Sequence, residues 1–331
     1  MTHLLLPPFE EVGKLGIMHL KRYWQRCMLT KAGRVTEGTK NEEFQLDKTL
    51  LFTLGLGLEQ TVRHLFLESP DFDEFEQWII DTAGYPPADK VERFNKAIIE
   101  KSQGGGRPVP NVLDAEQLAF WDDNGYLIIR NAISKEDCDK TIEVICNYID
   151  IKREDPDTWY NSHPSRQGIM VQLFQDPMLD KNRNSEKVRA VYEQLWNRTD
   201  LWVTADRVGF NPPENKTWKF PGPRLHWDTE LTFPFPFGLQ GILYLADTAE
   251  NQGAFSCVPG FQNRLEDWYN SLPEGANPYM QNLYDLGCIP IAANAGDFIV
   301  WHHALPHGSS TNTSDKPRFV QYFTYDPAGV E

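Results

Sequence analysis

The chain has 331 residues, 40% of them hydrophobic and 24% charged, which are ordinary proportions for a folded protein and exclude a disordered or collagen-like chain. Asp and Glu (47) outnumber Lys and Arg (32), and the resulting net charge of −15 disfavours nucleic acid or an anionic membrane as a partner. We expect no membrane-spanning helix and no secretory signal, and the five cysteines, which lack CxxC spacing, indicate reduced thiols and a cytoplasmic protein.

The first part of the chain, residues 1–103, is expected to be helical. Apolar residues recur with a helical period over 10–29 and 43–68, and the pattern continues over 72–79 and 91–98. One interpretation is an accessory bundle or a homodimer contact, and the other is a docking module for a carrier protein or another partner. The sequence does not separate these two.

A run of glycine and proline residues predicts a linker over 104–111, ahead of a second domain over 112–331. Asp114 is expected to cap a helix that runs to Asp123, and residues 125–130 read as a strand. Ser134 is expected to cap a second helix, which reaches about Ile149.

Beyond this point short apolar runs alternate with turn residues. The predicted strands are residues 168–174, 202–210, 239–246, 254–258, 297–301 and 318–325. Many short strands between Pro, Gly and Asn loops favour a sandwich or a jelly roll over a parallel sheet. Neither GxGxxG nor GxxxxGK[ST] occurs, so the sequence gives no support to a dinucleotide or P-loop site.

Four of the eight histidines lie at two places in the sequence. The first place is His226-Trp227-Asp228, where alternation along a strand would put the imidazole and the carboxylate on one face and Trp227 on the other. With a second histidine, this pair would make a 2-His-1-carboxylate triad, a donor set that suits Fe(II). An HxD motif by itself is weak, because chance occurrences are common and a structural histidine is the more ordinary explanation.

The second place is WHHALPHGSS, which holds His302, His303 and His307. Arg318 follows eleven residues after His307, and Ser309 lies between them. A guanidinium can grip a carboxylate through two hydrogen bonds, and a serine hydroxyl can donate beside it. Taken alone, Arg318 would be read as part of an ordinary ion pair, and His302 or His303 could replace His307 as the ligand.

Several segments together resemble the phytanoyl-CoA dioxygenase family, over about residues 112–326. They are QLAFWDDNGYLIIRNAISKEDCD, HWD, GAFSCVPGF, AGDFIVWHHALPHGSS and the PR that precedes the last strand. The resemblance implies an α+β fold, with a double-stranded β-helix (jelly-roll) core, flanking helices and an N-terminal helical extension. It also implies Fe(II), the cosubstrate 2-oxoglutarate and O2.

By the same resemblance, His226, Asp228 and His307 match the iron ligands, and the family pattern favours His307 over His302 and His303. Arg318 and Ser309 match the residues that hold the C5 carboxylate of 2-oxoglutarate. Gln172 lies in MVQLFQ, which resembles the strand that lines the C1 carboxylate of 2-oxoglutarate in the family. Met170 stands where some members have a basic residue. Tyr244 matches an aromatic position that borders the cosubstrate.

The expected activity is hydroxylation of an unactivated C–H bond in a small molecule such as an amino acid, an acyl compound or a natural-product intermediate. Related halogenases have a small residue at the Asp228 position, so a carboxylate there favours hydroxylation, while desaturation, cyclisation and epimerisation use the same triad. Two other classes stay open: a cupin-like metal-dependent isomerase or hydrolase, and a non-catalytic jelly-roll binding protein. The loop 233–238 is either a substrate-facing loop or an apolar cover.

Overall fold

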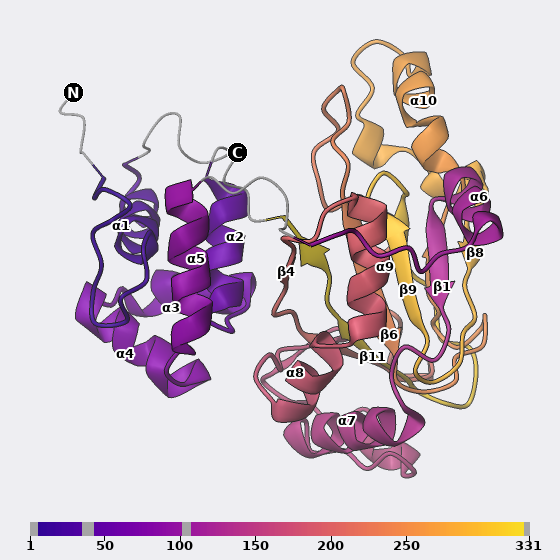
Figure 1. Ribbon diagram of the computed structural model, residues 1–331. Coiled ribbons are helices and arrows are strands. Elements are labelled where there is room, and N and C mark those ends of the chain that lie inside the picture. The colour runs from indigo at the N-terminus through magenta and orange to yellow at the C-terminus, as the bar shows by residue number, and fades with distance from the viewer. Residues whose placement is uncertain (1–5, 35–42, 101–106, 328–331) are drawn as a thin grey trace. The chain divides into compact units, whose positions relative to one another are not determined.

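The computed structural model describes residues 6–34, 43–100 and 107–327 (Figure 1). They fall into two compact units: the first runs to Val109 and also includes Trp196–Asp206 and the segment from Tyr325, and the second comprises Pro110–Leu195 and Arg207–Thr324. Positions 104–106 of the expected linker lie outside the described residues.

The first unit is mainly helical, as Figure 1 shows in indigo and purple. Its helices are α1 (Leu20–Lys31), α2 (Phe44–Thr53), α3 (Leu58–Glu68), α4 (Phe72–Ala83) and α5 (Ala88–Glu100). They bury one apolar cluster, in which Leu50, Leu65, Phe75 and Ile79 are fully covered. Two short strands, β4 (Trp202–Val203) and β12 (Tyr325–Asp326), pair antiparallel in the same unit.

The expectation of a helix over residues 10–29 is wrong in its first half, because α1 begins only at Leu20. The backbone N–H groups of Lys14 and Leu15 donate to the Glu76 carboxylate of α4, at 3.0 and 2.9 Å. A Cβ at Gly13 would lie 2.4 Å from that carboxylate, and Gly16 has a φ of +65°. A contact distant in sequence therefore overrides the local apolar period.

The long apolar stripe over 43–68 also divides, into α2 and α3. The chain turns at Gly55, whose φ of +70° is in the left-handed region that glycine adopts at no steric cost.

The second unit contains β1 (Tyr126–Ile129), β2 (Arg166–Gln167), β3 (Met170–Val171), β5 (Val208–Asn211), β6 (Leu239–Tyr244), β7 (Phe255–Cys257), β8 (Ile289–Pro290), β9 (Phe298–His302), β10 (His307–Ser309) and β11 (Arg318–Tyr322). Among the described residues they form a seven-stranded sheet, β1-β9-β6-β11-β5-β3-β2, and a three-stranded sheet, β10-β7-β8. All the pairings are antiparallel. This is the α+β jelly roll that the sequence predicts.

The two sheets of the second unit enclose a core of alternating inward side chains. Phe255 of β7 and Trp301 of β9 face each other with ring centroids 4.3 Å apart. Ile242, Tyr244 and Val320 belong to the same buried cluster. Side chains on the inward face of β6, β9 and β11 therefore meet those of β7 and β10, and any functional group in this space is shielded from water.

Helices flank the two sheets of the second unit (Figure 1). They are α6 (Ala115–Asn124), α7 (Lys135–Tyr148), α8 (Pro177–Arg183), α9 (Glu186–Trp196) and α10 (Leu265–Ser271), with 3-10 turns at Pro156–Thr158, Phe261–Asn263, Pro278–Met280 and Leu283–Leu286. Asp114 and Ser134 cap α6 and α7 as predicted, each accepting a backbone N–H from the first turn. No helix in the described segments is both long and apolar enough to cross a membrane.

Candidate metal centre and cosubstrate pocket

Three side chains with metal-binding atoms converge in the second unit: His226, Asp228 and His307. Nε2 of His226 lies 3.2 Å from Oδ1 of Asp228, and Nε2 of His307 lies 3.2 Å from Oδ2. Neighbouring ligands of an octahedral first-row metal are about 3 Å apart, given metal–nitrogen bonds of about 2.1 Å. The spacing of these donors therefore fits one shared ion.

The backbone holds the two histidines next to each other. His226 and His307 form an isolated antiparallel bridge, in which each N–H donates to the other's carbonyl oxygen, at 2.9 and 3.0 Å. Trp227 points to the opposite side, where its indole N–H donates to the Ala304 carbonyl oxygen at 2.8 Å. The expected alternation of His226, Trp227 and Asp228 is therefore present, although these residues form a single bridge and not a regular strand.

Each imidazole is oriented by a hydrogen bond from its other nitrogen. Nδ1 of His226 lies 2.7 Å from the Arg224 carbonyl oxygen, and Nδ1 of His307 lies 3.1 Å from that of Leu305. A carbonyl only accepts, so Nδ1 carries the proton of the neutral ring and the Nε2 lone pair is left to bind a metal; in the metal-free protein Nε2 can take up a second proton and donate it to Asp228. This is the tautomer that a metal ligand needs.

The electrostatics of the site favour an ionised carboxylate. Burial would raise the pKa of Asp228, but hydrogen bonds and charge from the two imidazoles outweigh it and hold that pKa well below its usual range. Burial lowers the pKa of His226, but the bonds to Asp228 and to the Arg224 carbonyl reverse the net shift upward. A carboxylate flanked by two imidazoles is a donor set that suits Fe(II).

His302 and His303 lie elsewhere. Nδ1 of His302 accepts the Ala304 backbone N–H at 3.0 Å, and Nε2 of His303 contacts the Pro236 carbonyl oxygen at 2.5 Å. The ligand atoms that gather within 4.8 Å of one another in this unit belong to His226, Asp228 and His307. The loop 233–238 packs on the other two histidines, with the Phe235 ring 4.9 Å from that of His303.

Arg318, at the start of β11, is fully buried at 0% exposure. Its Nε, Nη1 and Nη2 atoms have no hydrogen-bond partner among the described residues. An unpaired guanidinium in a protein interior is strongly unfavourable, so an anion is the group that would complete this site. A carboxylate matches the guanidinium fork.

Ser309 and Tyr244, the other residues expected to line the cosubstrate pocket, are both buried in the second unit. Ser309 is buried on β10, on the face that it shares with His307 by strand alternation. The Tyr244 hydroxyl accepts the Phe255 N–H at 2.7 Å and donates to the Ile291 carbonyl oxygen at 2.9 Å. Burial raises the pKa of Tyr244, and the positive charge of Arg318 offsets part of that rise. The Tyr244 hydroxyl thus links β6 of the large sheet to β7 of the small sheet, and only its ring is left to contact a bound molecule.

Gln172 follows β3, and alternation places it on the face of Met170. Its side-chain amide donates to the side-chain oxygen of Gln167 at 3.1 Å, and its backbone carbonyl oxygen accepts from the Tyr148 hydroxyl at 2.9 Å. Met170 pairs with Gly209 of β5, and Gly209 pairs with Val320 of β11, so this face continues the inward face of the large sheet.

Sequence reasoning missed Gln240, whose amide donates to Oδ2 of Asp228 at 2.5 Å. The alternation of β6 could have indicated this residue, because Gln240 is a polar residue on the same strand face as the buried Ile242 and Tyr244.

A second group of possible ligands, His19, Glu43 and Asp47, lies in the first unit. Its carboxylates are already paired: Arg26 bonds to both Glu43 and Asp47, and Arg22 bonds to Glu43 at 2.7 Å. The cations occupy the positions that a metal would need, so this is an ion-pair cluster.

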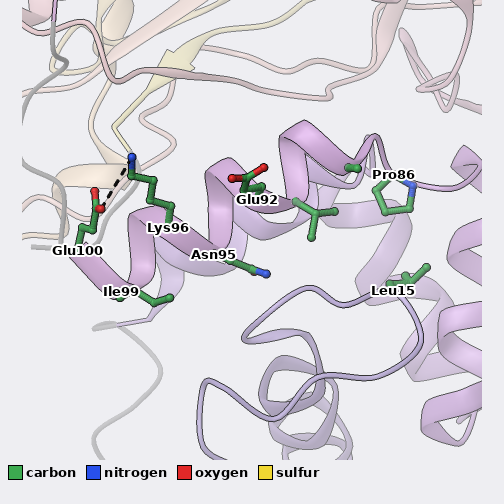
Figure 2. A pocket seen from close by; sticks show the side chains of 9 residues that line it. Leu15, Pro86, Glu92, Asn95, Lys96, Ile99 and Glu100 are labelled. Carbon is green, nitrogen blue, oxygen red and sulfur yellow. Dashed lines mark ion pairs between the residues drawn. The ribbon is translucent and has the colours of Figure 1, made fainter.

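The first unit also carries an open cavity of about 590 Å³ along α5, between Pro86 and Glu100 (Figure 2). Leu15, Val91 and Ile99 give it apolar walls, with Glu92 and Lys96 beside them. It shares no residue with the candidate metal centre.

A jelly roll with a histidine–carboxylate cluster is the arrangement of the non-haem iron dioxygenases. The chain belongs to the phytanoyl-CoA dioxygenase (PhyH) family, whose model matches residues 121–320. It is thus a 2-oxoglutarate-dependent dioxygenase, with Fe(II), 2-oxoglutarate and O2 as its cofactors.

Two relatives illustrate the family. A Dictyostelium discoideum protein named as a phytanoyl-CoA dioxygenase is 27% identical over 265 residues, which cover 64% of this chain and 75% of that protein. The peroxisomal phytanoyl-CoA dioxygenase of Rattus norvegicus is 24% identical over 229 residues, covering 61% of this chain and 65% of its own length. The chain therefore spans just under two thirds of the rat protein.

Solved structures with a similar chain path include EctD from S. alaskensis with bound Fe, at a TM-score of 0.48 and 19% identity, covering 68% of this chain and 83% of that one. HygX from Streptomyces hygroscopicus, with nickel and 2-oxoglutarate bound, aligns at a TM-score of 0.45 and 17% identity, covering 66% of this chain and 88% of its own. The metals and the 2-oxoglutarate belong to those proteins.

Proposed function

We propose that this enzyme hydroxylates an unactivated C–H bond of a small molecule, such as an amino acid, an acyl compound or a natural-product intermediate. His226, Asp228 and His307 hold Fe(II), and Arg318 with Ser309 holds the far carboxylate of 2-oxoglutarate. The observation that carries the proposal is the buried, unpaired guanidinium of Arg318, which belongs to the same jelly-roll unit as the three donors.

Bound Fe(II), with 2-oxoglutarate and O2, supplies the oxidation: one oxygen atom enters succinate, the other enters the substrate C–H bond, and CO2 leaves. The residues of the chain bind and orient. Arg318 neutralises the cosubstrate tail, and the apolar core beside it excludes water. The Asp228 side chain is 54% exposed whereas that of His307 is 7% exposed, so substrate approaches from the Asp228 side.

Asp228 also bears on the outcome of the reaction. Its carboxylate occupies the position that would otherwise be open to a halide, which favours hydroxylation over halogenation. Desaturation, cyclisation and epimerisation use the same triad, and mass analysis of the product separates them from hydroxylation.

Two further residues are assigned to the cosubstrate. Tyr244 borders the cosubstrate with its ring, which the influence of the Arg318 charge on the Tyr244 pKa supports. Gln172 borders the C1-carboxylate side, which its place on the inward face of the β2–β3 edge supports.

The remaining assignments concern the chain as a whole. Residues 1–103 are assigned to a helical accessory region, 104–111 to a linker and 112–331 to the oxygenase domain, of which Trp196–Asp206 and the segment from Tyr325 cluster with the helical unit. The helices are assigned a homodimer or carrier-protein contact. A cytoplasmic location and a role in biosynthesis complete the proposal. The location is supported by five cysteines that all stand as free thiols.

A substrate screen that reads succinate release tests the proposal, with Fe(II), ascorbate and 2-oxoglutarate present. We expect release that depends on a small-molecule substrate and disappears in Asp228→Ala. A cupin-like isomerase or hydrolase would turn over without 2-oxoglutarate and be indifferent to Arg318→Ala. A binding protein would keep its ligand affinity in the double variant His226→Ala/Asp228→Ala.

A further inference from the structure

Gln240, on β6, stands between the candidate metal centre and the core. Its Nε2 donates to Oδ2 of Asp228 at 2.5 Å, and its Oε1 accepts the indole N–H of Trp301 at 3.1 Å. The two bonds use both ends of one amide. Register explains the meeting, because Gln240 pairs with Trp301 across β6 and β9 and both side chains point inward.

The orientation of this amide is unambiguous. An indole N–H can only donate, so the atom that faces Trp301 is the oxygen. The NH2 group must then face Asp228, whose ionised carboxylate can only accept. Trp301 thus fixes the donor end of Gln240 toward Asp228.

Asp228 needs such support more than the two histidines do. Each imidazole is held by its own Nδ1 bond to a backbone carbonyl, and the histidines share a backbone bridge. The Asp228 side chain is 54% exposed and lies outside the regular strands. Apart from Gln240, the groups that contact its carboxylate are the two imidazole nitrogens, which would themselves bind the metal.

Trp301 also contacts the distal histidine. Its ring centroid lies 5.1 Å from that of His307 and 4.3 Å from that of Phe255. One buried side chain therefore packs against His307 directly and orients Asp228 through Gln240. The two donors, 79 positions apart in sequence, share this support.

We propose that Gln240, oriented by Trp301, is a positioning residue that fixes the Asp228 carboxylate for metal binding. The inference rests on the proposed function, since it takes Asp228 as a metal ligand. The amide holds Oδ2 in place and leaves Oδ1 available, and its N–H disperses part of the carboxylate charge. Hydrogen-bond partners of metal ligands typically contribute about 10- to 100-fold in metal affinity.

The test is an anaerobic titration of the full chain with Ni(II), which binds the site without turnover. Isothermal titration calorimetry gives the Ni(II) affinity. Gln240→Met keeps the side-chain length and removes the donor, and we expect Ni(II) affinity to fall about 10- to 100-fold. Trp301→Phe keeps a ring against His307 but frees the amide to turn, so a smaller loss is expected. In the double variant the loss should not exceed that of Gln240→Met alone, because both act through one bond.

Gln77 offers a matched control, because its amide donates to Asp81 at 2.9 Å and its oxygen accepts from Lys14 at 3.3 Å, in the helical unit. Gln77→Met should bind Ni(II) like the wild type. Ni(II) affinity within twofold of wild type in Gln240→Met, with Asp228→Ala abolishing binding, would overturn the inference and leave the metal site standing. Wild-type binding that is insensitive to Asp228→Ala would instead overturn the proposed function. If circular dichroism shows that Gln240→Met does not fold, Trp301→Phe takes its place: a loss of Ni(II) affinity supports the inference, and wild-type affinity contradicts it.

Discussion

His226 and His307 lie on separate segments, yet each donates its backbone N–H to the other's carbonyl oxygen. Their ring centroids are 4.8 Å apart. The geometry of the candidate centre thus begins in the backbone, before any metal is bound, and it depends on close approach of β10 to residues 223–226.

Gly308 permits that approach. A Cβ at this position would lie 2.7 Å from the Arg224 carbonyl oxygen and 3.1 Å from that of Pro223. Gly308→Ala should therefore push β10 away, weaken the bridge and destabilise the protein by about 1–3 kcal/mol. The affinity for metal should also fall. Chemical denaturation measures the free energy of unfolding, and Ni(II) titration measures the affinity. Unchanged values in both measurements would show that the bridge does not need this close contact.

Arg318 predicts a link between 2-oxoglutarate and stability. In the unliganded protein its buried charge is uncompensated, so Arg318→Met should unfold at the same temperature as the wild type or a higher one. With Ni(II) present throughout, saturating 2-oxoglutarate should stabilise the wild type further and should add little to the stability of the variant. Removing one member of a buried charge pair typically costs about 2–5 kcal/mol, which corresponds to a KM for 2-oxoglutarate raised by about 30-fold or more.

Arg318→Lys is the matched control for that experiment. It keeps the charge but loses the planar fork, so its KM should lie between those of the wild type and Arg318→Met. Thermal unfolding with and without the cosubstrate reads the effect independently of turnover. An equal 2-oxoglutarate shift in wild type and Arg318→Met would place the cosubstrate elsewhere.

His302 gives the stability a pH dependence. Burial, with a smaller contribution from His303, lowers the pKa of His302 to about 4. The unfolded chain, with a pKa near 6.5, takes up this proton more readily, so the stability contribution is complete above about pH 6.5 and is lost as the pH falls toward 4. The loss attributable to His302 should reach about 2 kcal/mol by pH 5. Urea unfolding at pH 7.5 and 5 should show a smaller drop in His302→Gln, and equal drops would refute the assignment.

Substitution of Arg26 tests whether the group of His19, Glu43 and Asp47 is an ion-pair cluster or a metal site. Arg26→Met leaves Glu43 and Asp47 without their shared partner. We expect a loss of about 3–5 kcal/mol in unfolding free energy and no change in the number of Ni(II) ions bound. A second Ni(II) ion in the wild type that disappears in Asp47→Asn would contradict this reading.

Much of the oxygenase domain was predictable from local signals. Asp114 and Ser134 cap their helices, and the runs 239–246 and 297–301 fall on β6 and β9, because cap chemistry and alternation are written in neighbouring residues. The predictions that failed, such as the helix over 10–19, did so where distant contacts decide. The run 202–210 divides into β4 and β5, which belong to different units.

The candidate site shows the same division. HxD and the distal histidine were visible in the sequence, because their residue types carry the chemistry. The contact of Gln240 with Asp228 was not, since it depends on the register of β6 against β9 and on where the chain after His226 lies. Nothing in the sequence marked the Arg318 guanidinium as unpaired, since that depends on all its neighbours in space.

The most direct test is an iron-edge anomalous difference map from crystals grown anaerobically with Fe(II) and 2-oxoglutarate. The account predicts one strong peak bonded to Nε2 of His226, a carboxylate oxygen of Asp228 and Nε2 of His307, with the C5 carboxylate of 2-oxoglutarate on the Arg318 guanidinium. A peak away from these three residues, or 2-oxoglutarate bound without contact to Arg318, would contradict it.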